Sequence, residues 1–209
     1  MSRFGPDPHA FFDAVYQDVA PWDIGDAQPA LLQLLDEYPP AEPVLDVGCG
    51  SGDLAIALAR RGLEVVGVDF VEAAVEEARA RAAALPPEAR RRLRFEVGDA
   101  LRPSRRGEPV GAVVDSGFLH LFDHDVRDRF AAELAATLPP GGRYYLLAFA
   151  VTFPVEHVPL QVDADELAAR FAAERGWRIL ACRPAEFLSR VGTVPATAAC
   201  IERVGAAGA

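Results

Sequence analysis

The sequence predicts an α/β domain built on a mostly parallel sheet. Short runs of aliphatic and β-branched residues alternate with stretches in which apolar residues recur at helical spacing, which is typical of successive βαβ units. A glycine-rich turn stands between the first predicted strand and the next helix. The chain has 209 residues, of which 51% are hydrophobic, and no repeat or linker divides it, so there is material for one core.

The expected strands are short apolar runs bounded by turn residues. Strands are predicted at residues 44–47, 64–68, 93–97 and 110–114, and a fifth follows at 143–150. Two more, at 179–183 and 195–204, come after the last helix and are expected to form an antiparallel pair.

The helices are recognised by their apolar spacing and by their stop signals. They are predicted at residues 54–61, from 71 to about 84 before Pro86 and Pro87, and from 126 to the PPGG turn at 139–142. Asp163 and Glu166 have the spacing of a capping box before a last helix that runs to about residue 174. The apolar positions are Val71, Ala74, Val75, Ala78 and Ala82 in the second helix, and Val126, Phe130, Leu134 and Leu138 in the third.

Residues 1–40 precede this alternation and carry two further helical patterns, at about 8–17 and 27–38. Ligands of open α/β sheets bind at the carboxyl ends of the strands. We therefore expect residues 1–40 to form a helical lid over that edge, and residues 41–209 to form the cofactor-binding domain.

The motif DVGCGSGD occupies residues 46–53, between a strand and a helix. Glycines allow a tight turn there and let a ligand approach the backbone. Asp69 ends the second strand, where a carboxylate can accept both hydroxyls of an adenosine ribose. Asp99 and Ala100 follow the third strand, where an acid can accept from an adenine amino group. This arrangement predicts an adenosine-cofactor site rather than a tight turn alone.

Two acids of the turn indicate which cofactor is bound. Asp46 and Asp53 would repel the pyrophosphate of a dinucleotide, which prefers a helix N-terminus free of carboxylates. They suit a ligand with an ammonium group and a sulfonium, such as S-adenosylmethionine. The glycine spacing is also Gly-x-Gly-x-Gly rather than the dinucleotide pattern.

These motifs strongly resemble those of class I S-adenosylmethionine-dependent methyltransferases, and the resemblance covers most of residues 40–205, including the PPGGR loop at 139–143. It implies a Rossmann-like, seven-stranded sheet with an antiparallel last strand. It also implies that Gly48 and Gly50 pack on the cofactor, that Asp69 holds the ribose, and that Asp99 and Ala100 hold adenine. The cofactor-binding residues expected are Tyr16, Trp22, Asp46, Gly48, Gly50, Asp69, Phe70, Asp99, Ala100 and Asp115.

The motif PWDIG at residues 21–25 and the motif DSGFLH at 115–120 resemble the thiopurine and halide methyltransferase branch. Closer still are bacterial enzymes that methylate small heteroaromatic or phenolic toxins and quinones. In that branch an N-terminal tryptophan closes over the cofactor, which maps onto Trp22. Phe11, Phe12 and Tyr16 would help to form the pocket, although the branch often has tryptophan at such positions.

On the acceptor side, His120 is the candidate general base because imidazole removes protons near neutrality. The alternative is a packed structural histidine between two leucines. Asp115 is expected to shape the methionine end of the cofactor, and His157 lies in a segment that often lines an acceptor pocket. The spacing of His120 and His124 does not indicate a metal site, because no third ligand is spaced to join them.

Composition limits the partners. The formal net charge is −10 and all 21 basic residues are arginine, which disfavours a broad grip on nucleic acid or an anionic membrane and excludes lysine chemistry. The start of the chain lacks the apolar region of a signal peptide, and the three cysteines are scattered, so we expect a bacterial cytoplasmic protein. Its expected partner is a small-molecule acceptor, and the oligomeric state is left open.

The leading hypothesis is therefore methyl transfer from S-adenosylmethionine to an O, N or S nucleophile of a small aromatic or heteroaromatic molecule. A halide or thiol methyltransferase is the alternative within the family. An NAD-dependent oxidoreductase, a non-catalytic cofactor-binding protein and a subunit of an RNA-modifying complex are the alternatives outside it.

Overall fold

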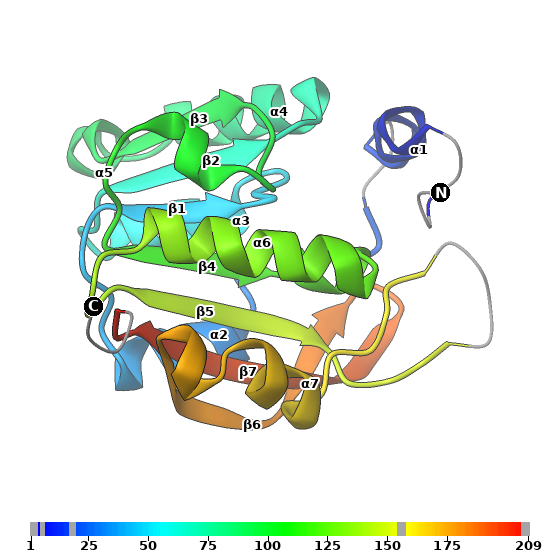
Figure 1. Ribbon diagram of the computed structural model, residues 1–209. Coiled ribbons are helices and arrows are strands. Elements are labelled where there is room, and N and C mark those ends of the chain that lie inside the picture. Colours follow the sequence, from blue (N-terminus) through cyan, green and yellow to red (C-terminus); the bar gives the residue numbers. More distant parts are fainter. Residues whose placement is uncertain (1–3, 5–6, 17–19, 154–157, 206–209) are drawn as a thin grey trace.

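The computed structural model describes residues 4, 7–16, 20–153 and 158–205, which form a seven-stranded sheet with helices on both faces (Figure 1). The strand order is β3-β2-β1-β4-β5-β7-β6, and β7 runs antiparallel to both of its neighbours. The predicted Rossmann-like sheet is confirmed. The strands are β1 (Val44–Val47), β2 (Val65–Asp69), β3 (Leu93–Val97), β4 (Ala112–Ser116), β5 (Arg143–Phe149), β6 (Trp177–Ser189) and β7 (Gly192–Arg203).

The centre of the sheet contains a switch in strand order. β1 pairs in parallel with β2 on one side and with β4 on the other. The chain leaves β1 toward β2 and β3 and then returns to the opposite side of β1 for β4, which opens a crevice at the carboxyl ends of these strands. β1 and β2 are buried along their whole length because both faces of the sheet are covered.

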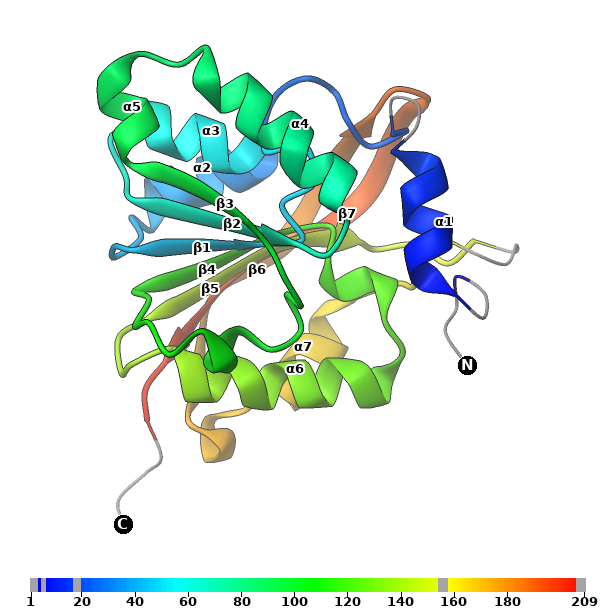
Figure 2. The same cartoon turned by 90° about the horizontal axis from the view of Figure 1, so that it is seen from above.

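Two helical layers cover the sheet (Figure 2). Leu34, Leu58 and Val75, from α2, α3 and α4, belong to the core on one face. Phe130 and Leu167, from α6 and α7, belong to the core on the other face. The helices are α1 (Pro8–Val15), α2 (Pro29–Glu37), α3 (Asp53–Arg60), α4 (Glu72–Ala83), α5 (Pro87–Arg91), α6 (His124–Thr137) and α7 (Ala164–Arg170), with the short 3₁₀ turns η1 (Pro103–Arg106), η2 (Leu119–Leu121) and η3 (Ala173–Arg175).

The two N-terminal helices, α1 and α2, pack against different parts of the sheet. α1 lies beyond the carboxyl ends of the central strands, where its Phe12 packs on Phe70 (Figures 1 and 2). α2 packs on a face of the sheet instead, with Leu31 and Leu34 fully buried in the same core as β1. The expectation that all of residues 1–40 covers the edge is therefore wrong for α2, because its apolar stripe needs a sheet face to bury it. The boundary at residue 40 stays a prediction.

The last two strands are longer than predicted. They pair antiparallel as expected, but β6 begins at Trp177 and extends to Ser189, and β7 begins at Gly192. The predicted strands are too short at Pro184 and Pro195, because proline is rare inside a sheet and therefore predicts a strand boundary. Pro184 lies in β6, the edge strand, which has a neighbouring strand on one side only. Pro195 lies beyond the last β5–β7 pair at Ala196. Neither proline therefore has to donate a hydrogen bond to a second neighbouring strand. In the described ranges, every helix falls short of the length and apolar character that a bilayer crossing requires.

Candidate functional site

The glycine turn connects β1 to α3 at the switch point. Gly48, Gly50 and Gly52 have φ angles of +66°, +52° and +87°, in the left-handed region that side chains disfavour. The Asp69 carboxylate joins this turn to the end of β2, since Oδ2 accepts from the Gly50 N–H at 3.0 Å and Oδ1 from the Val71 N–H at 2.9 Å. Burial raises the pKa of Asp69. The turn and the acid expected to hold a ribose thus form one rigid unit.

Asp46 stands at the base of the turn with an unsatisfied oxygen. Its side chain is buried, and within the described residues its Oδ2 has no hydrogen-bond partner. Burial raises the pKa of this carboxyl well above its usual range, and the negative charges of Asp115 and Asp69 add to the effect. A buried lone carboxylate oxygen needs a donor or a cation nearby, so Asp46 suits an ammonium group delivered by a ligand.

Asp53, the first residue of α3, is not a free carboxylate. Its carboxylate forms an ion pair with Arg81 of α4. Arg81 also donates through Nη1 to the carbonyl of Ser51 at 3.1 Å. The charge of Asp53 is therefore largely neutralised, and the repulsion expected against a pyrophosphate rests on Asp46 and Asp69.

The loop after β3 borders a cavity of about 280 Å³. Val47 and Val68 contribute to its apolar floor, and Asp99 and Ala100 line it at the carboxyl edge. The Asp99 side chain is 58% exposed and its Oδ1 accepts from the Leu101 N–H at 3.0 Å, which holds the carboxylate at the rim. An apolar floor with a polar rim suits a flat heteroaromatic ring.

Aromatic side chains from the N-terminal segment close the other side of the turn. The Tyr16 hydroxyl lies 2.5 Å from the place where a Cβ on Gly50 would stand. Trp22 is 36% exposed and meets the rings of Tyr16 and Phe12 at centroid distances of 6.2 and 6.3 Å. Phe12 in turn packs on Phe70 at 5.7 Å. The residues expected to cover the cofactor thus form one cluster.

Phe11 and Phe12 were expected to contact the acceptor. Both pack with Phe4, at centroid distances of 5.1 Å, and Phe12 is buried. The structure therefore places them in the lid cluster, together with Phe70 and Leu121, and their contact with an acceptor stays a prediction. His157 lies outside the described residues.

Asp115 acts on the loop after β4. Its Oδ1 accepts from the Phe118 N–H at 2.6 Å, and its Oδ2 accepts from the Leu119 N–H at 2.9 Å and from the Tyr144 hydroxyl at 2.6 Å. The side chain is fully buried, and burial raises its pKa to about 6. Because the side chain is fully buried, Asp115 fixes the backbone of residues 118 and 119, and its predicted role at the methionine end would be exerted through that loop.

His120 has the geometry of a hydrogen-bond donor rather than of a base. Its Nδ1 accepts from the Phe149 N–H at 3.1 Å, so in the neutral ring Nε2 carries the proton. Burial, aided by the positive charge of Arg127, lowers the pKa of His120 to about 3. The ring packs on Phe149 and Phe187 at centroid distances of 4.4 and 6.1 Å. This arrangement argues against the predicted general base, because neither nitrogen is free to accept a proton.

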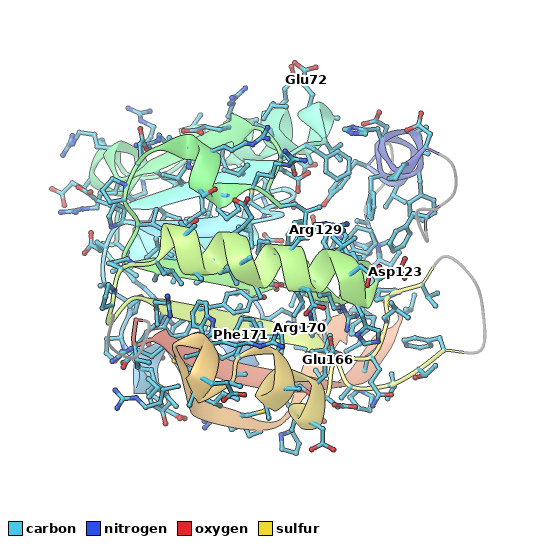
Figure 3. All side chains as sticks on the ribbon, viewed as in Figure 1. Glu72, Asp123, Arg129, Glu166, Arg170 and Phe171 are labelled. Atoms are coloured by element: carbon cyan, nitrogen blue, oxygen red, sulfur yellow. The ribbon has the colours of Figure 1, made fainter. Side chains whose placement is uncertain are left out.

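Sequence reasoning missed Arg127, whose side chain is completely buried. It pairs with Glu166 and donates to the carbonyl of Gln161, so it joins α6 to α7. Glu166 also pairs with Arg170, and Figure 3 labels these two residues. Arg127 precedes Phe130 and Leu134 at helical spacing, and this spacing alone indicates that it lies on the buried face of α6.

The site fits S-adenosylmethionine on its own chemistry. It offers a buried carboxylate at Asp46, whose Oδ2 has no partner among the described residues, for the ammonium group. It also offers an acid at Asp69, bonded to the turn, for the ribose and a cavity beside Asp99 for adenine. The glycines have no side chains, which lets the Phe118 ring and the Tyr16 hydroxyl approach the turn at Gly48 and Gly50.

The comparisons with known proteins agree with this geometry. Residues 44–142 match the family described as a methyltransferase domain. The 2-heptyl-1-hydroxyquinolin-4(1H)-one methyltransferase of Mycobacteroides abscessus is 30% identical over 129 residues, which cover 62% of this chain and 56% of that protein. The demethylmenaquinone methyltransferase of Deinococcus radiodurans is 40% identical over 109 residues, covering 51% and 42%. The chain spans about half the length of the curated relatives it matches.

Solved structures extend the likeness to nearly the whole chain. One, reported for the conversion of a disulfide bond into a thioacetal group during echinomycin biosynthesis, has a TM-score of 0.79 and 28% identity over 94% of this chain and 92% of that one. The 1,6-didemethyltoxoflavin-N1-methyltransferase of Burkholderia thailandensis shares the fold, with a TM-score of 0.68 and 21% identity over 94% and 84%. Residues 44–142 thus match a methyltransferase domain, and nearly the whole chain shares its fold with solved methyltransferase structures.

Proposed function

We propose that the protein transfers the methyl group of S-adenosylmethionine to an oxygen, nitrogen or sulfur nucleophile of a small aromatic or heteroaromatic molecule. The observation that carries this proposal is the set of carboxylates at the carboxyl edge. Asp46, Asp69 and Asp99 stand at or near the ends of three neighbouring strands, beside the left-handed glycine turn.

The cofactor supplies an activated methyl group on a sulfonium, so the chain has to bind, orient and exclude water. Asp46 would hold the ammonium group, Asp69 the ribose hydroxyls, and Asp99 the adenine amino group. Phe118 packs against the turn, where a Cβ on Gly48 would stand 2.5 Å from its ring, and so limits access of water from the β4 side.

The acceptor side is aromatic. Phe149 packs on Phe187 at 5.1 Å and on Phe153 at 5.8 Å, next to the ring of His120. Such a wall favours a flat apolar acceptor. The relatives named for a hydroxyquinolinone and for demethylmenaquinone support that substrate class. In our proposal the Nε2–H of His120 donates a hydrogen bond to the acceptor and does not remove its proton.

A thiol acceptor is the second candidate. A probable thiol methyltransferase of Arabidopsis thaliana is 28% identical over 147 residues, 70% of this chain and 64% of that protein. Thiols ionise closer to neutrality than phenols do, so a thiol acceptor depends less on a base. A panel of phenols, heteroaromatic N–H compounds, thiols and iodide, with release of S-adenosylhomocysteine as the readout, separates these classes.

We also propose a cytoplasmic setting in a bacterium and no role for nucleic acid. The three cysteines are free, which suits a reducing compartment. The net charge of −10 opposes binding to a phosphate backbone.

Isothermal titration with S-adenosylhomocysteine tests the cofactor assignment. We expect Asp69→Ala to weaken binding by about tenfold or more, because charge-assisted hydrogen bonds are lost. Asp36→Ala, which removes an exposed partner of Arg61 far from the turn, is the matched control and should bind as the wild type does. Wild-type protein that binds NADH but no S-adenosylhomocysteine at millimolar concentration would overturn the proposal in favour of an oxidoreductase.

A further inference from the structure

The segment that joins α1 to α2 is held in place at both ends. Residues 20–28, which we call the strap, are non-helical. The Arg190 N–H donates to the carbonyl of Pro21 at 2.9 Å. The Gln28 side-chain amide exchanges two hydrogen bonds with the backbone of Leu188, both of 2.8 Å, and Gln28 is buried. Through these bonds the tip of the β6–β7 hairpin fixes the two ends of the strap.

Asp23 attaches the middle of the strap to the glycine turn. Its Oδ1 accepts from the Gly25 N–H at 2.8 Å, a bond within the strap itself. Its Oδ2 accepts from the hydroxyl of Ser51 at 2.8 Å. Ser51 is buried and lies between the last two glycines of the turn. One carboxylate therefore holds the shape of the strap with one oxygen and contacts the cofactor turn with the other.

The bond between Asp23 and Ser51 lies in a charged setting. Arg81 Nη1 is 3.9 Å from Asp23 Oδ2 and donates to the carbonyl of Ser51 at 3.1 Å. Arg81 is also paired with Asp53, so its guanidinium faces both carboxylates. The acceptor is ionic and the side chains of Asp23 and Arg81 are 15% and 29% exposed, a setting in which a hydrogen bond is stronger than at the open surface.

The strap carries Trp22, which directly precedes Asp23. The indole packs on Tyr16, and the Tyr16 hydroxyl reaches the position above Gly50. When the strap lies on the turn, the indole and the phenol therefore cover the backbone that a cofactor must approach. A ligand as large as S-adenosylmethionine passes this cover only if the strap moves.

We propose that Asp23 is a positioning residue whose hydrogen bond to Ser51 latches the strap, and with it Trp22, onto the glycine turn. This inference rests on the proposed function, because it assigns the turn to a cofactor. The latch holds the closed state, so breaking it speeds the escape of product and exposes Trp22. The roles divide cleanly between two residues: Asp23 also shapes the strap, whereas Ser51 contributes to the latch alone.

Two readouts test the latch in the Trp177→Phe background, which leaves Trp22 as the single tryptophan. The first is acrylamide quenching of Trp22 fluorescence in the free protein, which needs no ligand. The second is the dissociation rate of S-adenosylhomocysteine in stopped flow. We expect Ser51→Ala to raise the quenching constant about twofold and the dissociation rate about tenfold, as the loss of one charge-assisted hydrogen bond would do.

A double-mutant cycle separates a latch from two unrelated effects. If the Asp23–Ser51 bond is the latch, Asp23→Ala combined with Ser51→Ala changes the dissociation rate no more than Asp23→Ala does alone. Independent, multiplying effects of the two substitutions would overturn the inference, and so would wild-type quenching in Ser51→Ala. The control is again Asp36→Ala, which removes an exposed aspartate with its arginine partner outside the turn and should alter neither readout.

The outcome also distinguishes this inference from the proposed function. If the wild-type protein binds no S-adenosylhomocysteine, the proposed function fails, and the quenching comparison still decides whether the Asp23–Ser51 bond holds Trp22 in place. If the ligand binds but Ser51→Ala leaves both readouts unchanged, the latch fails and the function stands. Melting temperatures measured for each variant verify that the fold is retained.

Discussion

Replacing His120 with asparagine tests whether this histidine is a neutral donor or a base. The Oδ1 of asparagine can take the place of Nδ1 and accept from the Phe149 N–H, so the substitution His120→Asn keeps this contact and removes the titratable ring. The lost packing of the ring on Phe149 lowers stability equally at every pH. The difference in stability between wild type and variant therefore depends on pH only through the proton that the imidazole takes up.

The size of that effect follows from the burial of the ring. Burial and the charge of Arg127 lower the pKa of His120 from its ordinary 6.5 to about 3 in the folded protein. The unfolded chain therefore binds a proton below pH 6.5 that the folded chain refuses. The stability contributed by neutral His120 is fully present above pH 6.5 and falls as the pH drops toward 3. At about 1.4 kcal/mol per pH unit, the wild type loses about 2 kcal/mol between pH 6.5 and pH 5 that His120→Asn does not lose.

The assay is urea unfolding followed by circular dichroism between pH 8 and pH 5, with the difference in free energy of unfolding between wild type and variant as the quantity compared. Asp115 works in the opposite sense, because its pKa is raised to about 6 and its contribution is lost as the pH rises through that value. Asp115 is present in both proteins, so its effect cancels in the difference.

The control for this experiment is His124→Asn. It makes the same change of residue at an imidazole that is 71% exposed. We expect it to change the pH dependence of stability far less than His120→Asn does. A wild-type minus His120→Asn difference that stays constant from pH 8 to pH 5 would refute the reasoning. His120 would then protonate in the folded protein and be available as a base.

Two further predictions concern stability. Gly48→Ala places a Cβ 2.5 Å from the Phe118 ring at a φ of +66°, so left-handed strain and overpacking together should cost about 2–5 kcal/mol in urea unfolding. Gly62→Ala has a φ of +91° and open space, so it should cost only the strain of about 1–2 kcal/mol, and equal losses would contradict the contact. Arg127→Met removes one of the two buried arginines that pair with Glu166 and leaves only Arg170, so it should lower the free energy of unfolding by about 3 kcal/mol. A loss below about 1 kcal/mol would mean that this pair contributes little to the join between α6 and α7.

The strands and most helices could be predicted because their signals are local. β1 and β3 have the predicted bounds, and α3, α4 and α6 begin and end within a few residues of prediction. The apolar spacing of a helix and the bare apolar run of a buried parallel strand are properties of neighbouring residues. The length of the β6–β7 hairpin was underestimated. A proline interrupts a sheet only where its backbone N–H would be needed as a hydrogen-bond donor, and for Pro184 and Pro195 this depends on the pairing of the strands.

The candidate site was predictable where residues adjoin a strand end. Asp46, Asp69 and Asp99 come together because parallel strands end at one edge, which the alternation of elements already implied. The charge state and the partners of each side chain were not predictable. Asp53 is neutralised by Arg81, which lies 28 residues away along the chain, and nothing in the local pattern indicates that contact.

By itself, the sequence determined the fold class, the family resemblance and the acids at the carboxyl edge, since these depend on residue type and on spacing along the chain. Only the tertiary structure decided what His120, Asp115 and Asp23 do. The Phe149 N–H, the Tyr144 hydroxyl and the Ser51 hydroxyl that contact them come from other elements. Whether a polar side chain accepts, donates or is already satisfied depends on partners that folding brings from distant parts of the chain.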